Sequence, residues 1–439
     1  MQKGKHLLLL LFCLQIIIAL QGQAPQRLEV DLNQLFTLAD KNARTLKIAD
    51  LNERIAAENI NDKKKQLLPN IEASLTVSYL GNGFIADRDF SHGTTVPIPH
   101  FGNNFALEAT QVIYAGGAIK TSIEMARLDH VLAQLHKQAN QQDIRFVIAG
   151  YYLELLKLDN QKKILEQNIM QTEKLLHQIS ARHQQGTALR NNKTRYELQL
   201  QSLELALLKL ENSEIIINTE LVKTLQLPKG TRLAPNGASL NISLQVVNAA
   251  AWQEIGIQNS PLLKQLPLYA QQAEWGETLA KAEKKPQVFA FATDKMDGPI
   301  TIEVPPLNKN FNYWYAGVGI KYNLSSLFKT DNKIKLAKLE TQKVAEANSR
   351  IQEELANEIE AAHLRYRETL KVYNTHVKAV ELATENYTII KNRYLNDLVL
   401  ITEMLDAENE KVDAELQAAN AQINILFHYY QLKKITGTL

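Results

Sequence analysis

The stretch WYAGVGIKYNL, residues Trp314–Leu324, alternates apolar residues with polar or small ones along its whole length. A period of two is typical of a β-strand that buries one face. At about ten residues, the stretch also has the length of a tilted β-strand that crosses a lipid bilayer. It therefore predicts a strand whose apolar side meets either a soluble core or lipid. That side carries Trp314, Ala316, Val318, Ile320, Tyr322 and Leu324.

Three other segments share this pattern. Ile71–Leu80 alternates as cleanly, whereas Asn104–Tyr114 and Gln287–Thr293 alternate less regularly. A small soluble sheet would explain the alternation, but aromatic residues also bracket the strands, as they do at the two interfaces of a membrane barrel. We therefore favour strands in lipid. The aromatics that we place at the membrane interfaces are Tyr79, Tyr114, Trp314 and Tyr322.

The four strands belong to two copies of one larger unit, made of two strands, a very long helix, a short break and a second helix. We expect the helices of the first copy at Ala118–Ser180 and Ala188–Leu225, and those of the second at Asn332–Arg393 and Leu400–Thr436. Solenoid repeats have periods of about 20–50 residues, so this unit is too long to be one. We therefore interpret the sequence as a tandem duplication of one half, and we expect pseudo-symmetry to relate the two halves in the structure.

The expected helices are too long for a globular core. No proline lies between Pro99 and Pro228, and neither proline nor glycine lies between Thr330 and Thr436. A helix of about sixty residues spans about 90 Å, so such helices must pack side by side. An apolar seam in the second copy advances about 3.5 residues per step, which is coiled-coil spacing. Its members are Ile359, Ala362, Tyr366, Leu370, Tyr373, Val377, Val380, Tyr387 and Tyr394.

Strands in lipid cannot come from one chain alone. Four strands leave two open edges, and unpaired backbone groups in hydrocarbon cost several kcal/mol each. Closed barrels begin at about eight strands, which two copies would supply, but the interior of such a barrel is filled by side chains. Three copies give twelve strands and also house the helices in a tube. We therefore expect a homotrimer.

The N-terminus is typical of a secretory signal peptide. Lys3 and Lys5 precede an apolar run from Leu7 to Leu20, and Gly22 offers a small residue for cleavage. The run is shorter than the roughly 20 residues that a membrane-spanning helix needs. Cys13 is the only cysteine and lies inside the run. Cleavage after Gly22 would leave a mature chain without thiolate chemistry.

Features of enzymes and of nucleic-acid-binding proteins are missing from the sequence. The pairs His130/His136 and His177/His183 are six residues apart, whereas helical metal pairs are spaced i, i+4. The formal net charge is +2 and no basic stripe is interleaved with aromatics. We expect no enzymatic activity, no cofactor, no metal site and no nucleic-acid partner.

Three segments carry a resemblance to a known family: YLNDLVLITEMLDAE (Tyr394–Glu408), RHQQGTAL (Arg182–Leu189) and LPN (Leu68–Asn70). They resemble the two hairpin tips and the start of the first strand of the TolC-type outer membrane efflux proteins, and the resemblance extends over essentially the whole mature chain. It implies a mainly α fold with some β structure. Long antiparallel helical hairpins would form a periplasmic α-barrel, and four transmembrane strands per chain would complete a 12-stranded β-barrel in a homotrimer.

The resemblance also implies a function. The chain would be the outer membrane channel of a tripartite efflux or export system, embedded in outer membrane lipid and extending into the periplasm. As a passive exit duct, it would dock onto a periplasmic membrane-fusion (adaptor) protein and an inner-membrane transporter. The alternative is a periplasmic coiled-coil scaffold or adaptor without a pore, which would not need the aromatic strands.

Candidate site residues follow from the resemblance. The hairpin tips would meet the adaptor, although Asp397 stands where the family usually has glycine. Acidic residues on the following helix match those at the narrow periplasmic entrance, where a carboxylate ring would attract cations; ordinary solvated acids are the alternative. The tip residues are Gly186, Thr187, Ala188, Leu189, Asp397, Leu398 and Val399. The entrance residues are Glu403 and Asp406, with Arg393 and Tyr394 in links that hold it shut.

The expected organisation follows the duplication. It comprises a signal peptide (1–22), N-terminal periplasmic helices (23–68), barrel strands 1–2 (69–114) with an outer loop (81–103), and a first long hairpin (115–227). Then follow a linker with short equatorial helices (228–285), barrel strands 3–4 (286–325) with an outer loop (294–312), and a second long hairpin (326–439).

Overall fold

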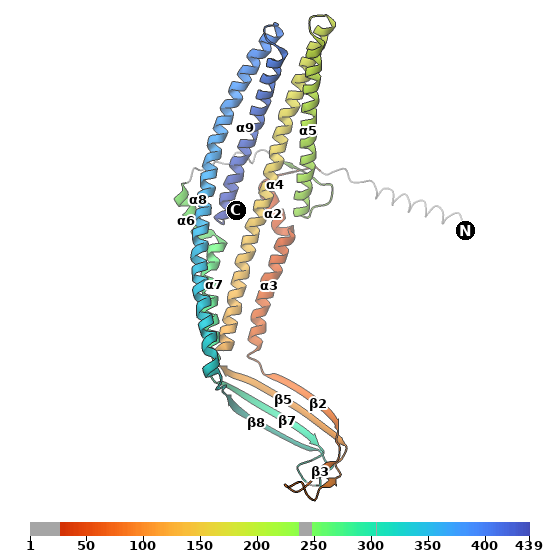
Figure 1. The fold of residues 1–439 in the computed structure, drawn as a ribbon, viewed down its shortest axis with the longest axis vertical. Helices are drawn as coiled ribbons and strands as arrows, with labels where there is room; N and C mark the ends of the chain where they lie inside the picture. The colour runs from red at the N-terminus through yellow and green to blue at the C-terminus, as the bar shows by residue number, and fades with distance from the viewer. Residues whose placement is uncertain (1–26, 237–247, 304) are drawn as a thin grey trace, which may run out of the picture. The chain divides into compact units, whose positions relative to one another are not determined.

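Figure 1 shows the computed structural model, which describes residues 27–236, 248–303 and 305–439. The expected signal peptide, residues 1–22, lies outside them. The chain forms two units. The sheet unit comprises Asp50–His136 and Leu262–Gln352, and the hairpin unit comprises the residues up to Ala49, Lys137–Pro261 and Glu353–Leu439. The chain is mainly helical with some strands, as the sequence predicts.

The sheet unit contains one four-stranded antiparallel sheet in the order β2-β5-β7-β8. Its strands are β2 (Asn70–Tyr79), β5 (Phe101–Ala115), β7 (Gln287–Gly298) and β8 (Phe311–Lys321). Each lies at one of the four segments that alternate in the sequence. The two outer strands, β2 and β8, each pair on one side only within the described chain, and every residue of β2 is exposed.

The register brings the alternating apolar positions of the four strands onto one face, while Phe289 and Phe291 of β7 lie on the other. Ile71 lies opposite Ala109, Ala109 opposite Ala292, and Ala292 opposite Ala316. Because side chains alternate along a strand, the neighbouring positions form a second, more polar face. The apolar face is open in the single chain: Leu75 is 70% exposed and Trp314 is 76% exposed.

An irregularity in β5 explains why that strand alternates poorly in the sequence. The pairing with β7 shifts between Val112 and Tyr114, where a β-bulge inserts one extra residue. The shift reverses the alternation, so Tyr114 lies opposite Val288 on the apolar face. Without this extra residue, Tyr114 would point to the polar face.

Two strands differ in length from their alternating segments: β8 ends at Lys321 rather than at Leu324, and β7 is longer than predicted. β7 continues to Gly298 rather than ending near Thr293, because the polar residues after Thr293 keep pairing with both neighbouring strands. The expected outer loop 294–312 is shorter for the same reason. Within the expected outer loop 81–103, a small hairpin joins β3 (Gly83–Ile85) to β4 (Thr94–Val96).

Long helices connect to the sheet. They are α3 (Arg44–Lys65), α4 (Ala118–Gln184), α7 (Pro261–Ala282) and α8 (Ser326–Leu395). Polar contacts tie α4, α7 and α8 together inside the sheet unit: the Asn348 side chain donates to the Leu266 carbonyl at 2.8 Å, and the Gln272 side chain donates to Asp129 at 2.8 Å. None of the described helices is long and apolar enough to cross a membrane.

The hairpin unit contains α5 (Arg190–Thr224) and α9 (Ile401–Ile435), which pair with the distal parts of α4 and α8 (Figure 1). Two short helices, α2 (Leu32–Asn42) and α6 (Ala249–Asn259), lie in the same unit. The sequence did not predict that β1 (Arg27–Val30) would pair in parallel with β6 (Arg232–Pro235). These strands are four residues long, too short for a visible period.

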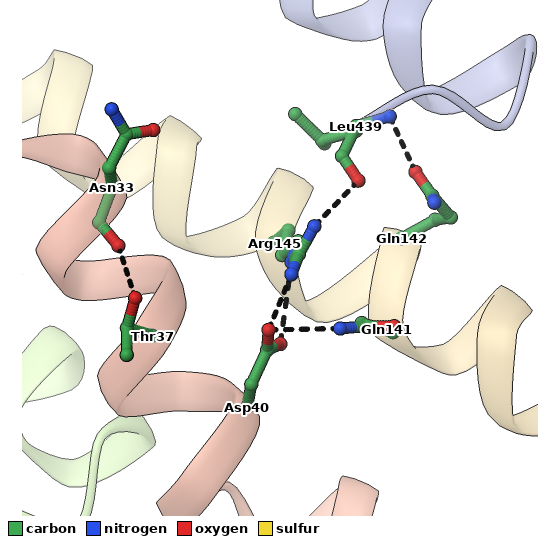
Figure 2. Close-up of polar contacts among 7 residues, drawn as sticks. All are labelled: Asn33, Thr37, Asp40, Gln141, Gln142, Arg145 and Leu439. Atoms are coloured by element: carbon green, nitrogen blue, oxygen red, sulfur yellow. Dashed lines mark hydrogen bonds and ion pairs between the residues drawn. The ribbon is translucent and has the colours of Figure 1, made fainter.

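Arg145 of α4 joins three separate segments of the hairpin unit (Figure 2). Its guanidinium donates to the Asp40 carboxylate of α2 and, at 3.0 Å, to the backbone oxygen of Leu439. Gln141 donates to the same carboxylate at 2.9 Å, and the Leu439 amide donates to Gln142 at 2.8 Å. These contacts fix the segment after α9 against α4 and α2, at the end of α9 opposite its hairpin tip.

Candidate functional site

The turn at the first hairpin tip is set by its backbone. At the end of α4 the Gly186 amide donates to the His183 carbonyl at 3.0 Å, and the Thr187 amide donates to the Arg182 carbonyl at 2.9 Å. This pair of bonds is a Schellman motif, which places the residue after the helix in the left-handed region. Gly186 has φ +75°, and glycine accepts this conformation without a side-chain clash.

The second tip repeats this turn with a different residue. Asp397 donates its amide to the Tyr394 carbonyl at 3.0 Å, and Leu398 donates to the Arg393 carbonyl at 2.9 Å. Asp397 has φ +59°, so an aspartate occupies the left-handed position. That conformation costs an ordinary residue about 1–2 kcal/mol and is tolerated best by asparagine and aspartate after glycine. The departure from the family's glycine therefore leaves the turn geometry unchanged.

The Asp397 side chain connects the two tips. An Arg182 Nη atom lies 2.5 Å and 2.6 Å from the two carboxylate oxygens of Asp397. Arg182 is largely covered, with 24% of its side chain exposed, whereas Asp397 is 72% exposed. A pair this exposed contributes about 0–1 kcal/mol. Its main effect is to bridge the end of α4 and the end of α8 within one chain.

The tips present apolar side chains to solvent. Leu189 is 72% exposed, Leu398 66% and Leu400 69%. Of the other predicted tip residues, Gly186, Thr187 and Asp397 are exposed, while Ala188 and Val399 are half-buried. The predicted tip residues therefore gather at the two turns of the hairpin unit, where three large leucine side chains lack cover.

The four predicted entrance residues do not form one cluster in the single chain. Glu403 and Asp406 are exposed on α9, and Arg393 is exposed at the end of α8. Tyr394 points the other way and is 6% exposed in an apolar cluster. The Glu403 carboxylate accepts the Leu400 amide at 3.3 Å, so it also caps the N-terminus of α9.

Next to these residues lies a group that sequence reasoning missed. Buried polar side chains interrupt the apolar contact between the two hairpins. We call them the polar layer, which comprises Asn168 and Thr172 of α4, Tyr196 of α5, and Glu408 and Lys411 of α9; all five are less than 9% exposed. The sequence did contain a signal: on α9, Ile401, Met404, Glu408, Lys411 and Glu415 follow 3–4 spacing, which marks a coiled-coil seam with acids inside it.

Glu408 is the least satisfied member of the polar layer. Its Oε1 accepts the Thr172 hydroxyl at 2.5 Å. The other carboxylate atom, Oε2, and the Tyr196 hydroxyl are both buried, and neither has a hydrogen-bond partner among the described residues. Burial raises the pKa of Glu408, against the opposing effects of the Thr172 and Tyr196 hydroxyls and of the Lys411 and Lys391 charges. Burial also raises the pKa of Tyr196, and the charge of Glu408 adds to that effect.

Lys411 does not neutralise Glu408. Its Nζ pairs with Glu415 Oε1 at 2.9 Å and donates to Asn168 Oδ1 at 3.2 Å. It also lies over the Tyr387 ring, 5.5 Å from the centroid. Burial raises the pKa of Tyr387 to about 12, and Glu408 contributes to that rise. The lysine is therefore engaged with Glu415, Asn168 and Tyr387.

In the described part of the chain, no three His, Cys, Asp or Glu side chains lie close enough together to hold a metal ion.

A comparison with models of protein families identifies a related family. Residues 35–225 match the family model described as outer membrane efflux protein. This segment ends with the first hairpin, so the match covers only the first copy of the duplication. No curated protein matches the sequence.

Solved structures extend the comparison to the second copy. The outer membrane protein VceC of Vibrio cholerae has 16% identity and a TM-score of 0.76, covering 92% of this chain and 96% of its own. The CmeC outer membrane channel of Campylobacter jejuni has 15% identity and a TM-score of 0.75, covering 93% and 85%. The MtrE outer membrane channel of Neisseria gonorrhoeae, in its open state, has 17% identity and a TM-score of 0.74, covering 92% and 88%.

At these identities the structures establish the fold, and the family model adds the sequence evidence. The predicted resemblance to the TolC-type outer membrane efflux proteins is thus confirmed, in sequence over residues 35–225 and in fold across both copies.

Proposed function

We propose that three copies of this chain form an outer membrane channel, the passive exit duct of a tripartite efflux or export system. One observation carries the proposal: a four-stranded sheet with a continuous apolar face on one side and open edges at β2 and β8. Such a sheet is incomplete as a single chain. Lipid would cover the exposed apolar face, and neighbouring copies of the chain would pair with the open edges.

The apolar face fits lipid. Its large side chains lie outside any core of the single chain, with Leu75 70%, Val318 68% and Ile320 74% exposed. Two aromatic levels bound this face. Tyr79 and Trp314 lie toward the end of the sheet away from the helices, and Tyr114 and Tyr322 lie toward the helical end. Aromatic girdles at both interfaces are typical of transmembrane barrels.

The opposite face fits a water-filled lumen. Glu72 lies across from Glu108, and Thr76 lies across from Asn104. Lys295 pairs with Glu108 at 3.1 Å, and Asn104 bonds to Asp297. Charged and polar groups on the inward positions are expected for a channel rather than for a filled core.

The open edges of the sheet, at β2 and β8, favour its closure into a barrel with other copies. An unpaired strand edge in hydrocarbon costs several kcal/mol per backbone group, and the two outer strands provide complementary antiparallel partners between copies. Three copies would close twelve strands, which is enough for a lumen. The exposed leucines of the tips, Leu189, Leu398 and Leu400, would then form a ring of apolar contacts for a periplasmic adaptor protein joined to an inner-membrane transporter.

The test measures conduction and the orientation of the two faces together. Purified protein is inserted in planar bilayers as the Thr76→Cys and Leu75→Cys variants, adjacent residues on opposite faces of β2. We expect a discrete conductance in both variants. A membrane-impermeant thiol reagent should reduce it only at Thr76→Cys, because Leu75 would face lipid.

The competing function, a periplasmic scaffold without a pore, makes the opposite prediction. Such a protein would give no conductance in either variant, and the reagent would modify both cysteines alike in detergent-free buffer. Either result would contradict the proposed channel.

A further inference from the structure

The polar layer lies next to the turn of the second hairpin. Tyr196, one of its members, belongs to the same buried cluster as Met404, Ile401 and Tyr394. Glu408 lies one helical turn beyond Met404 on α9, and it bonds to Thr172 on α4 of the other hairpin. A change in Glu408 would therefore act directly on the contact between the two hairpins at the predicted entrance.

The charge state of Glu408 is decided by its surroundings. The side chain is 2% exposed, and no cation among the described residues forms an ion pair with it. A buried carboxylate without a partner strongly favours its neutral form. The neutral acid still accepts the Thr172 hydroxyl through Oε1, and its own proton gives Oε2 a donor that can reach the Tyr196 oxygen.

The described helices packed around Glu408 offer no cation that forms an ion pair with it. On α4, Asn168 and Thr172 carry none, and on α5 Tyr196 is a neutral phenol. On α8, Tyr387 is neutral and the Lys391 ammonium lies 5.6 Å from its ring centroid. On α9, Lys411 and Glu415 pair with each other at 2.9 Å. The two cations therefore have other contacts. Their charges lower the pKa of Glu408, but burial raises it by more, and an ionised Glu408 would lack a direct ion pair.

We propose that Glu408 is a proton-operated latch, whose neutral form holds the two hairpins together and whose ionised form loosens them at the periplasmic entrance. This inference rests on the proposed channel, because it names how that channel's entrance is regulated. Acid favours the packed hairpins, and rising pH favours their separation, since water must enter to solvate the carboxylate.

The test compares three proteins in planar bilayers between about pH 5 and about pH 8: the native sequence, Glu408→Gln and Glu410→Gln. Glutamine keeps the Thr172 hydrogen bond and cannot ionise. Glu410 is an exposed acid on the same helix and serves as the matched control. We expect the native open probability to rise severalfold with pH, Glu410→Gln to follow it, and Glu408→Gln to stay at the low-pH level throughout.

A second readout does not depend on conduction. Infrared spectra should contain the carbonyl band of a neutral carboxylic acid that disappears in Glu408→Gln but not in Glu410→Gln. The latch is overturned if Glu408→Gln keeps the native pH curve, if the native protein conducts with no pH dependence, or if that band is absent at acid pH. If none of the three proteins conducts at any pH, the proposed channel fails, and the latch fails with it.

Discussion

The first hairpin turns at Gly186 and the second at Asp397, and both turns use the same pair of backbone hydrogen bonds. The far ends of α5 and α9 repeat this agreement: Gln226 and Gly437 both follow the helix with positive φ, at +54° and +76°. The side chains between these points differ. The position of Glu408 in the second copy corresponds to Glu197 in the first, which is exposed and pairs with Lys193 at 3.5 Å.

This difference shows which parts of a duplicated fold are kept. Helix length and caps determine where the chain turns, so both copies retain them, and even an aspartate is accommodated in a glycine conformation. The residues packed between the two hairpins differ between the copies, because each copy contributes a different face to that contact. The buried Glu408 of α9 is therefore matched by an exposed glutamate, Glu197, at the equivalent position of α5.

The largest expected effect tests the two faces of the sheet. Leu75→Lys places a charge on the apolar face of β2, and Thr76→Lys places it on the polar face one residue away. A lysine near the bilayer midplane costs about 2–4 kcal/mol per chain. We expect Leu75→Lys to lose the heat-modifiable oligomer on gels of outer membrane extracts, while Thr76→Lys retains it. Equal behaviour of the two variants would contradict the assignment of the faces.

The next effect tests the asymmetry between the copies. Met404 is 0% exposed, whereas its counterpart Lys193 has 39% of its side chain exposed. Met404→Ala should destabilise the hairpins by about 2–5 kcal/mol through the cavity it leaves. Lys193→Ala should change stability by less than about 0.5 kcal/mol. Resistance of the hairpins to limited proteolysis measures both, and a comparable loss in Lys193→Ala would mean that the copies pack alike.

The pH dependence of hairpin stability follows from the raised pKa of Glu408. A group that holds its proton more tightly when folded adds stability at acid pH and loses it as pH rises. The loss should begin near the ordinary pKa of glutamate and continue up to the raised value, at no more than about 1.4 kcal/mol per pH unit. Proteolysis at several pH values should show this slope in the native protein and in Glu197→Gln. A slope that persists in Glu408→Gln would contradict the prediction.

The smallest effect concerns the ion pair between the tips. Arg182→Ala removes the partner of Asp397, and Arg393→Ala removes the corresponding arginine of the second copy, which is exposed. An exposed pair is worth about 0–1 kcal/mol, so neither variant should affect folding. Spin labels at Leu189 and Leu398 should report a broader range of tip separations in Arg182→Ala only. A broadening in both variants would indicate that the pair is not specific.

Much of the fold could be predicted because its determinants are local. Alternation in Ile71–Leu80 and in the stretch from Trp314 fixed two strands and the direction of their apolar faces, and the lack of helix breakers fixed the long helices. The β-bulge before Tyr114 could not be predicted, because one inserted residue leaves no mark except irregular alternation. The pairing of β1 with β6 depends on contacts between segments far apart in the sequence.

The candidate site was predicted less completely. Tip residues could be located because turns depend on a few neighbouring residues, and Asp397 shows that the turn tolerates a change of side chain. Tyr394 was placed at the entrance, yet in the single chain it is part of a buried cluster. Glu408 was overlooked as a buried acid because its burial depends on Thr172 and Tyr196, which come from two other helices.

One measurement tests the central claim, that the single sheet is completed by other copies. Cys13 is the only native cysteine, so a fixed cysteine at Ala316 on β8 can be combined with single cysteines along β2 and oxidised in the membrane. We predict disulfides at alternate positions of β2 and a covalent ladder that ends at three chains. Absence of crosslinks between chains, or a ladder that ends at two chains or continues past three, would contradict the account.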